Sequence, residues 1–160
     1  MDEERQQLAS RLFQQAYELQ MKGELEAAAT QYQRSIDVLP TAEAYTFLGW
    51  TYSFMGKIDE AIQECYKAIR VDPEFGNPYN DIGAYLIQKG EWDDAVPWLK
   101  RAIIAPRYAN YEFPHLNLGR VYEQRGEWQA AMDEYQLALK ANPNYVLAAR
   151  ALKRLQTMFN

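Results

Sequence analysis

The 160-residue chain has one cysteine, Cys65, and one histidine, His115, and this scarcity excludes several kinds of chemistry. A lone cysteine cannot form a disulfide within the chain, which fits a reducing compartment, so we expect a cytoplasmic location. One Cys and one His supply neither a nucleophile–base arrangement nor a credible metal set. We therefore expect a chain that is not an enzyme, with no catalytic residue, no metal and no cofactor.

Long hydrophobic runs and an excess of basic residues are also absent. No run approaches the roughly 18 apolar residues of a membrane span, and the start at Met1–Arg5 lacks the basic and apolar regions of a secretory signal. The chain has 17 Lys and Arg against 22 Asp and Glu, a formal net charge of −5. A general phosphate-backbone binder needs the opposite balance. We therefore expect neither nucleic acid nor a membrane as a partner.

Glycine and proline are few, 8 and 7 residues, while hydrophobic residues make up 48% of the chain. This composition is typical of one packed domain, residues 1–160, rather than a disordered chain. The two acidic pairs that resemble catalytic carboxylates, Asp59-Glu60 and Asp93-Asp94, each open a predicted helix, where negative charge is favourable.

The few small residues recur at a nearly constant interval, which is the sequence signature of a repeat architecture. Three sets of positions repeat every 33 to 36 residues: Ala16, Gly49, Gly83 and Gly119; Gly23, Gly56, Gly90 and Gly126; Ala28, Ala61, Ala95 and Ala131. The alternative is an ordinary helical bundle with scattered small residues, but a bundle needs no fixed repeat length. We therefore interpret the chain as a series of similar helical units.

Each set has a physical reason. A glycine within a helix costs about 1 kcal/mol relative to alanine, so Gly49 and its equivalents predict a close approach of a second helix, which the alanine set would provide. Gly56 and its equivalents suit the left-handed residue that ends a helix. A proline near the end of each unit, such as Pro73, stops the second helix.

The residues that carry a family resemblance are most complete in the second and fourth units. They are Tyr45, Leu48, Gly49, Tyr52, Ala61, Ala68 and Pro73, and then Leu118, Gly119, Tyr122, Ala131, Tyr135, Ala138 and Pro143. This pattern resembles the tetratricopeptide repeat, a helix-turn-helix unit of 34 residues. The resemblance implies an all-α fold: a right-handed α-solenoid of four repeats, at about 8–41, 42–75, 76–111 and 112–143, and a capping helix at about 144–158.

Two units depart from the pattern. The first is weaker, and the third contains Pro97 early in its second helix, where we expect a bend, and a two-residue insertion after Pro106. We expect helices at about 5–21, 25–38, 42–55, 58–71, 77–89, 92–104, 113–125, 128–141 and 144–158. The last helix should bury a stripe formed by Val146, Ala149, Leu152 and Leu155, while Lys153 would obstruct a following helix, as a terminal cap requires.

The resemblance also implies a concave groove, lined by the first helices of the repeats, that receives a peptide or a partner helix. The matching positions with an aromatic side chain are Phe13, Tyr17, Phe47 and Trp50. The matching polar positions are Asn77, Asn80, Asp81, Asn117, Arg120, Arg150 and Arg154. We expect the aromatics to form an apolar anchor, the asparagines to pair with a bound backbone and the arginines to form a local positive region that holds a carboxylate.

Each expected role has an alternative. The aromatics, Phe13 and Phe47 above all, suit ordinary core between repeats. The asparagines and arginines suit solvated positions without a ligand. His115 and Cys65 fall at positions that usually belong to the core. The carboxylate clamp by which some members of the family hold chaperone tails is absent, because neither frame of the matching positions contains a cation: Phe13, Tyr17, Phe47, Asn77 and Asp81, or Thr46, Trp50, Asp81, Phe113 and Asn117.

We therefore interpret the chain as a non-enzymatic protein-interaction module that binds a protein or peptide partner. Two alternatives stay open. Trp98, Ile104 and Leu137 lie at positions that often face outward, so the chain is also a candidate self-assembling scaffold or homo-oligomer. The third possibility is a chaperone dedicated to a secreted substrate.

Overall fold

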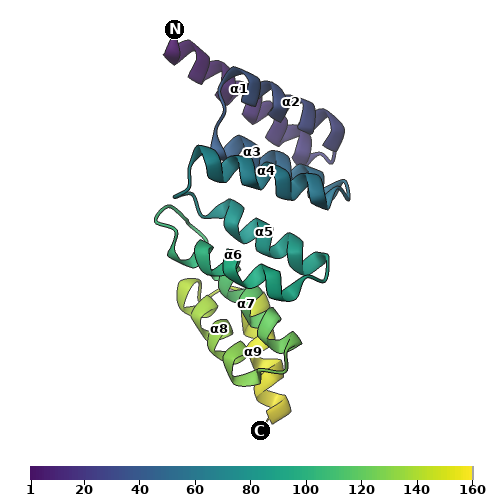
Figure 1. The fold of residues 1–160 in the computed structure, drawn as a ribbon, viewed down its shortest axis with the longest axis vertical. Coiled ribbons are helices and arrows are strands. Elements are labelled where there is room, and N and C mark those ends of the chain that lie inside the picture. Colours follow the sequence, from purple (N-terminus) through teal and green to yellow (C-terminus); the bar gives the residue numbers. More distant parts are fainter. Residues whose placement is uncertain (160) are drawn as a thin grey trace.

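A computed structural model describes residues 1–159, and this part of the chain is an all-α solenoid whose termini lie at opposite ends (Figure 1). Its nine helices are α1 (Asp2–Met21), α2 (Leu25–Val38), α3 (Ala42–Phe54), α4 (Ile58–Val71), α5 (Asn77–Gln88), α6 (Trp92–Ile104), α7 (Glu112–Gln124), α8 (Trp128–Ala141) and α9 (Val146–Phe159). The expected helices agree with these bounds to within three residues.

The helices pair in sequence order into four hairpins, each closed by a glycine turn. In the second hairpin, Gly56 has φ +79°, its N–H donates to the Ser53 carbonyl at 3.1 Å, and the N–H of Lys57 donates to the Tyr52 carbonyl at 2.9 Å. A side chain is strained at this φ, which is why glycine ends the first helix. The expected left-handed turn is confirmed.

The glycines within the helices mark the closest approach of the two helices in a hairpin. A Cβ built on Gly83 would lie 2.4 Å from Cδ2 of Leu99, and one on Gly119 would lie 2.3 Å from Cε1 of Tyr135. The partner alanines, such as Ala61 and Ala131, are completely buried. The packing reason that the sequence predicted for these small residues is therefore confirmed.

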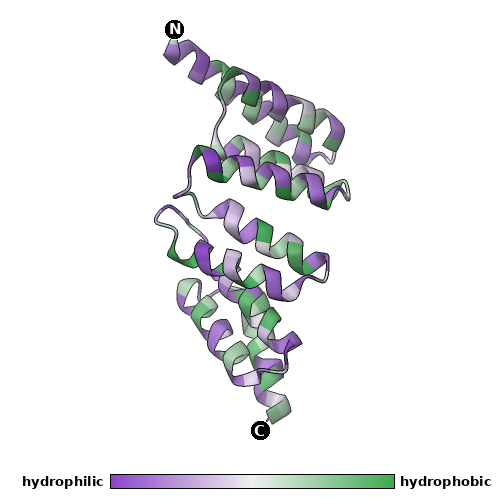
Figure 2. Ribbon diagram, viewed as in Figure 1, coloured by the Kyte–Doolittle hydropathy of each residue, from purple (hydrophilic) through white to green (hydrophobic). Residues whose placement is uncertain are grey.

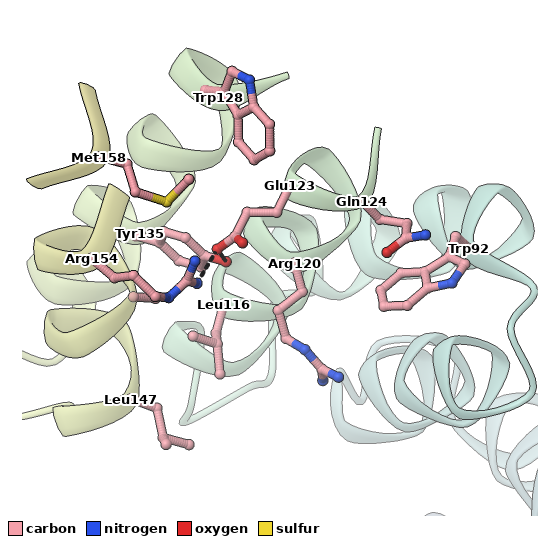
Figure 3. A pocket seen from close by; sticks show the side chains of 11 residues that line it. Trp92, Leu116, Arg120, Glu123, Gln124, Trp128, Tyr135, Leu147, Arg154 and Met158 are labelled. Carbon is pink, nitrogen blue, oxygen red and sulfur yellow. Dashed lines mark hydrogen bonds and ion pairs between the residues drawn. The ribbon is translucent and has the colours of Figure 1, made fainter. Parts of the chain in front are cut away.

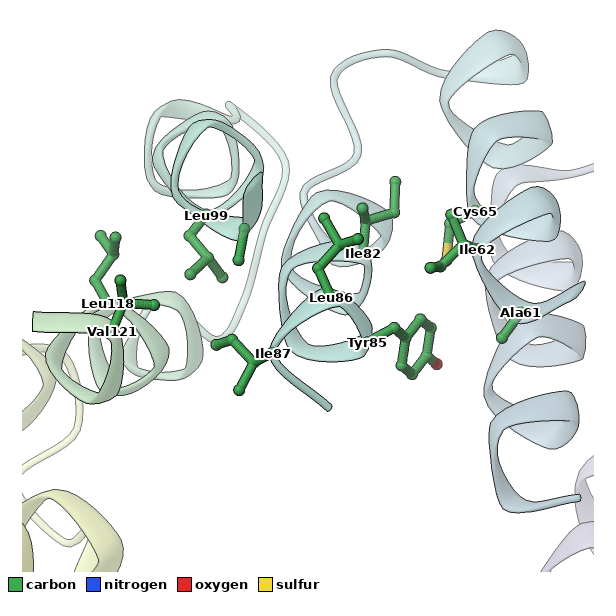
Figure 4. Close-up of a cluster of buried hydrophobic side chains, with 11 residues drawn as sticks. Ala61, Ile62, Cys65, Ile82, Tyr85, Leu86, Ile87, Leu99, Leu118 and Val121 are labelled. Atoms are coloured by element: carbon green, nitrogen blue, oxygen red, sulfur yellow. The ribbon is translucent and has the colours of Figure 1, made fainter. Parts of the chain in front are cut away.

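The core runs along the solenoid and does not stop at hairpin boundaries. Figure 4 shows one stretch of it, in which side chains of α4, α5, α6 and α7 pack together, among them Ile62, Ile82 and Leu118. Cys65 is completely buried there, and burial raises the pKa of its thiol well above the ordinary range. His115 is half-buried with Nδ1 2.7 Å from Oε2 of Glu134. Both residues are therefore part of the packing, as expected.

The third hairpin differs from the others at its C-terminal end. Helix α6 is continuous through Pro97, and residues 105–111 then form a loop that returns to the start of α5. The N–H of Gly76 donates to the Arg107 carbonyl at 3.0 Å, and the N–H of Arg107 donates to the Glu74 carbonyl at 3.1 Å. These bonds hold the loop that contains the insertion against the segment that connects α4 to α5.

The last helix buries a different stripe from the expected one. Val146 and Ala149 are exposed, Leu152 is half-buried, and the completely buried residues of α9 are Ala148 and Leu155. The expected stripe was wrong at its first half, because α9 begins after Tyr145 and packs against α8 on the face that contains Ala148. Lys153 is exposed, where a following helix would have to pack.

Hydrophilic and hydrophobic residues are mixed along the helices, as Figure 2 shows. None of the helices within residues 1–159 has both the length and the apolar character needed to span a bilayer.

Candidate functional site

Aromatic side chains of α1 and α3 form one connected cluster around Phe47. Its ring centroid lies 5.1 Å from that of Phe13, 5.8 Å from that of Trp50 and 6.0 Å from that of Tyr17, all edge-to-face. Phe13 and Phe47 are half-buried and also contact the fully buried Tyr32. Phe13 and Phe47 therefore contribute to the core between hairpins, while Tyr17, 37% exposed, lies at the solvent side of the cluster.

A pocket of about 310 Å³, called the central pocket below, lies where the first helices of three hairpins meet. Helix α3 contributes Thr46, Phe47 and Trp50, α5 contributes Asn77 and Asp81, α7 contributes Phe113, and the 105–111 loop contributes Tyr108. The structure thus brings together four of the residues expected from the sequence, namely Phe47, Trp50, Asn77 and Asp81. The polar and aromatic residues that the sequence assigned to separate halves share this pocket.

Tyr108 is the pocket residue that the sequence did not predict. It enters the pocket because the 105–111 loop is bonded to Glu74 and Gly76, and its ring packs on Gly76, where a Cβ would lie only 2.6 Å from ring atoms. Burial raises the pKa of the Tyr108 phenol above its ordinary range. The two-residue insertion was the available signal, because an insertion in a repeat places extra side chains outside the repeated positions.

Asp81 has an electrostatic setting unlike that of the other carboxylates. It is half-buried, and no Lys or Arg among the described residues forms an ion pair with it. Burial raises its pKa to about 7, against an ordinary value of 3.8, although the neighbouring Asn80 side chain acts in the opposite direction. The pocket therefore contains a carboxylate that changes charge near neutral pH.

Two of the three asparagines expected to pair with a bound backbone are instead hydrogen-bonded to each other. Asn80 and Asn117 are buried, and Nδ2 of Asn117 donates to Oδ1 of Asn80 at 3.1 Å. Arg120 Nη1 donates to Oδ1 of Asn117 at 3.4 Å. The solvated interpretation of both asparagines is wrong, because their amides link α5 to α7. With Arg120, the two amides form a polar chain from α7 to α5.

A second pocket, of about 580 Å³, lies between α7 and α9 and is called the C-terminal pocket (Figure 3). Oε1 of Glu123 accepts hydrogen bonds from Nη2 of Arg154 and from the Tyr135 hydroxyl, both at 2.6 Å. Arg120 also lines this pocket, whereas Arg150 is exposed elsewhere on α9. The expected positive region is thus reduced, because the charge of Arg154 is balanced by Glu123.

The residues proposed for self-assembly differ in their exposure. Trp98 is half-buried, with its ring 6.3 Å from that of Tyr79 and the guanidinium of Arg101 5.1 Å from it. Ile104 and Leu137 are 79% and 42% exposed. Trp98 therefore belongs to the packing between hairpins, while Ile104 and Leu137 are accessible.

Residues 1–159 contain no group of three or more His, Cys, Asp and Glu that could hold a metal ion. The two pairs Asp59-Glu60 and Asp93-Asp94 lie in the first turns of α4 and α6, as expected. Asp59 pairs with Lys89 and Asp93 with Arg125, both at 2.7 Å, so both carboxylates have structural partners.

The chain is similar to known repeat proteins. Two tetratricopeptide repeat family models match residues 42–75 and 113–145. The tetratricopeptide repeat and J domain-containing co-chaperone DNJ1 of Cryptococcus neoformans is 26% identical over 158 residues, which cover 92% of this chain and 30% of that protein. Two other curated relatives are also much longer, since the chain spans 18% and 22% of them.

Solved structures share the fold at lower sequence identity. Pseudomonas aeruginosa pilF superposes with a TM-score of 0.89 at 21% identity, over 96% of this chain and 70% of that one. YrrB, described as a tetratricopeptide repeat protein with an unusual peptide-binding site, superposes with a TM-score of 0.67 at 22% identity, over 92% and 75%. The two family-model matches show tetratricopeptide repeats at residues 42–75 and 113–145, and the solved structures show that the described chain shares the fold of tetratricopeptide repeat solenoids.

Proposed function

We propose that the chain binds a segment of a partner protein in a groove formed by the first helices of its hairpins, with the central pocket as the main anchoring point. The two tetratricopeptide repeat matches support the broader statement that it is a protein-interaction module, and such modules are typically non-catalytic. The observation that carries the finer proposal is the central pocket itself, which collects side chains from α3, α5, α7 and the 105–111 loop.

Aromatic side chains supply the binding surface. The Phe47 cluster continues from Tyr17 through Trp50 to Phe54, whose ring centroid lies 5.1 Å from that of Trp50 and which is 59% exposed. Partly exposed aromatics that contact one another over two helices offer apolar area that a partner can bury. The C-terminal pocket adds Arg120, whose guanidinium places a positive charge at the other end of the proposed groove.

A variant with two substitutions tests the groove. Peptides selected from a random library on the wild-type chain are measured against Trp50→Ala combined with Arg120→Glu, and we expect the dissociation constant of groove-bound peptides to rise at least tenfold. The matched control is Leu137→Ala with Lys140→Glu, which also removes one apolar side chain and reverses one charge, but on exposed positions of α8. Unchanged affinity in the folded groove variant would exclude the groove.

Self-association is the second candidate, because Ile104 is 79% exposed on α6. Light scattering over a concentration range distinguishes self-association from peptide binding in the groove. A dimer that Ile104→Lys dissociates supports self-association, whereas a monomer at all concentrations excludes it.

A chaperone role, as the name of the DNJ1 relative suggests for that protein, would use the same groove. A substrate protein that is stable when co-expressed with this chain and unstable without it would identify a chaperone role.

A further inference from the structure

The side chains that line the central pocket determine which charge a bound group can have. Four of its seven lining residues are aromatic, namely Phe47, Trp50, Tyr108 and Phe113, and one is the carboxylate of Asp81. The faces of aromatic rings carry partial negative charge and attract cations, most strongly for tryptophan. No lining residue is basic. Both the rings and the carboxylate therefore favour a positively charged group.

We propose that the central pocket binds the guanidinium group of an arginine side chain from the partner, with Asp81 as its counter-ion and the aromatic rings as its walls. This inference rests on the proposed groove and gives the chemistry of its central contact. It differs from a site for a carboxylate, because the charge of the pocket is opposite to what a carboxylate would require.

The two other kinds of occupant fit less well. An acidic side chain would place a second carboxylate next to Asp81, and two carboxylates in one partly buried site repel each other. An apolar side chain would cover Asp81 and leave its ionised form without a compensating partner, which is costly in a partly desolvated site. A cation removes that cost by pairing with Asp81.

Arginine is favoured over lysine by hydration and geometry. A guanidinium is more weakly hydrated than an ammonium, stacks on aromatic faces and donates two parallel hydrogen bonds to one carboxylate. Asn77 and Tyr108, which also line the pocket, carry further hydrogen-bond acceptors. An ammonium is a compact and strongly hydrated charge, so it gains less from flat aromatic walls.

Binding of this kind depends on pH, because only the ionised form of Asp81 attracts a cation. The titratable groups close to it are Cys65 of α4, Tyr85 of α5 and Tyr108 of the loop, and burial raises the pKa of all three, so they stay neutral between pH 6 and 8. The α3 and α7 walls contribute Thr46, Phe47, Trp50 and Phe113, which do not titrate. With a pKa of about 7 in the free protein, the ionised fraction of Asp81 rises about tenfold from pH 6 to pH 8.

Blocked pentapeptides of sequence Gly-Ala-X-Ala-Gly test the inference, with arginine, lysine, citrulline, leucine or glutamate at X. Binding is measured by NMR from the indole N–H of Trp50, assigned with the Trp50→Phe variant. At pH 8 we expect the arginine peptide to bind at least tenfold more tightly than the citrulline peptide, which has the same shape without the charge, and more tightly than the lysine peptide. The arginine affinity should fall about tenfold at pH 6.

Asp81→Asn is the decisive variant, because it keeps the size of the side chain and removes the charge. We expect it to abolish both the preference for arginine over citrulline and the pH dependence, while Asp94→Asn, at an exposed position of α6, changes neither. The proposal is overturned if the arginine peptide gives no saturable shift, if citrulline binds equally well, or if folded Asp81→Asn keeps the preference. If the leucine peptide binds tightly and the variant Trp50→Ala with Arg120→Glu loses this binding, the groove proposal stands. Only the proposal that the pocket binds a cation is then refuted.

Discussion

The central pocket and the C-terminal pocket each contain a carboxylate from the first helix of a hairpin, but the two carboxylates have different surroundings. Glu123 accepts hydrogen bonds from the Tyr135 hydroxyl and from Arg154, both at 2.6 Å. Asp81 has no ion-pair partner among residues 1–159, and burial raises its pKa to about 7. A carboxylate whose partners lie within the fold supports packing, whereas one without a cation can recognise a ligand.

The same contrast exists between the outer and inner hairpins. In the first and last hairpins, a fully buried tyrosine of the second helix donates a hydrogen bond to the first helix: Tyr32 to Gln20 at 2.7 Å, and Tyr135 to Glu123. The corresponding positions of the two inner hairpins are Cys65 and Leu99, which are smaller and make no such bond. The side-chain hydrogen bonds between the two helices of a hairpin thus concentrate at the outer units. The central pocket is lined mainly by α3, α5 and the 105–111 loop, with Phe113 from the last hairpin.

The largest expected effect on stability comes from substitutions of Tyr135, which lines the C-terminal pocket. Tyr135→Ala removes a fully buried ring from the contact with Gly119 and should lower the free energy of unfolding by about 3–5 kcal/mol. Tyr135→Phe keeps the ring and loses only the bond to Glu123, so it should cost about 1–2 kcal/mol. Urea denaturation followed by circular dichroism measures both values. Equal losses for the two variants would show that the hydroxyl, not the ring, supports this hairpin.

An intermediate effect of opposite sign is expected in the central pocket. The pKa of Asp81 in the folded chain, about 7, is higher than the ordinary 3.8, so its contribution to stability is fully present below pH 4 and is lost as the pH rises through 7. Asp81→Asn should therefore be more stable than the wild type by about 1–3 kcal/mol at pH 8, and the gain should vanish near pH 4. Denaturation midpoints at several pH values measure this. A variant less stable than the wild type at pH 8 would mean that a cation within the fold pairs with Asp81.

The smallest expected effect concerns Arg154, whose side chain is 53% exposed. Because exposed ion pairs contribute little, Arg154→Gln should lower the stability by less than about 1 kcal/mol, and the difference should shrink in high salt. Thermal unfolding at low and high salt measures it. A larger loss that salt does not reduce would show that the hydrogen bond to Glu123, rather than the charge, matters.

The sequence could predict which residues occupy groove-facing positions of the helices. It could not predict which of these side chains contact one another. Phe47, Trp50, Asn77 and Asp81 follow from the repeat alone, because equivalent positions of stacked hairpins lie on one face. The pairing of Asn80 with Asn117 depends on side-chain rotamers across two helices, and these are not encoded in spacing. The position of Tyr108 depends on how one loop folds back, and no repeat pattern describes that loop.

The sequence by itself determined the solenoid: its recurring glycines and alanines fix where helices turn and how closely they pack, since few other residues fit a φ near +80° or the helix contacts at Gly83 and Gly119. Only the tertiary structure decided which polar side chains are satisfied. It paired Glu123 with Arg154, joined Asn80 to Asn117 and placed Tyr108 in the same pocket as Asp81. Within residues 1–159, it left Asp81 without a cation. The physical reason is range: turns and helix faces are set by residues a few positions apart, whereas charge pairing depends on distances of a few ångströms between distant segments.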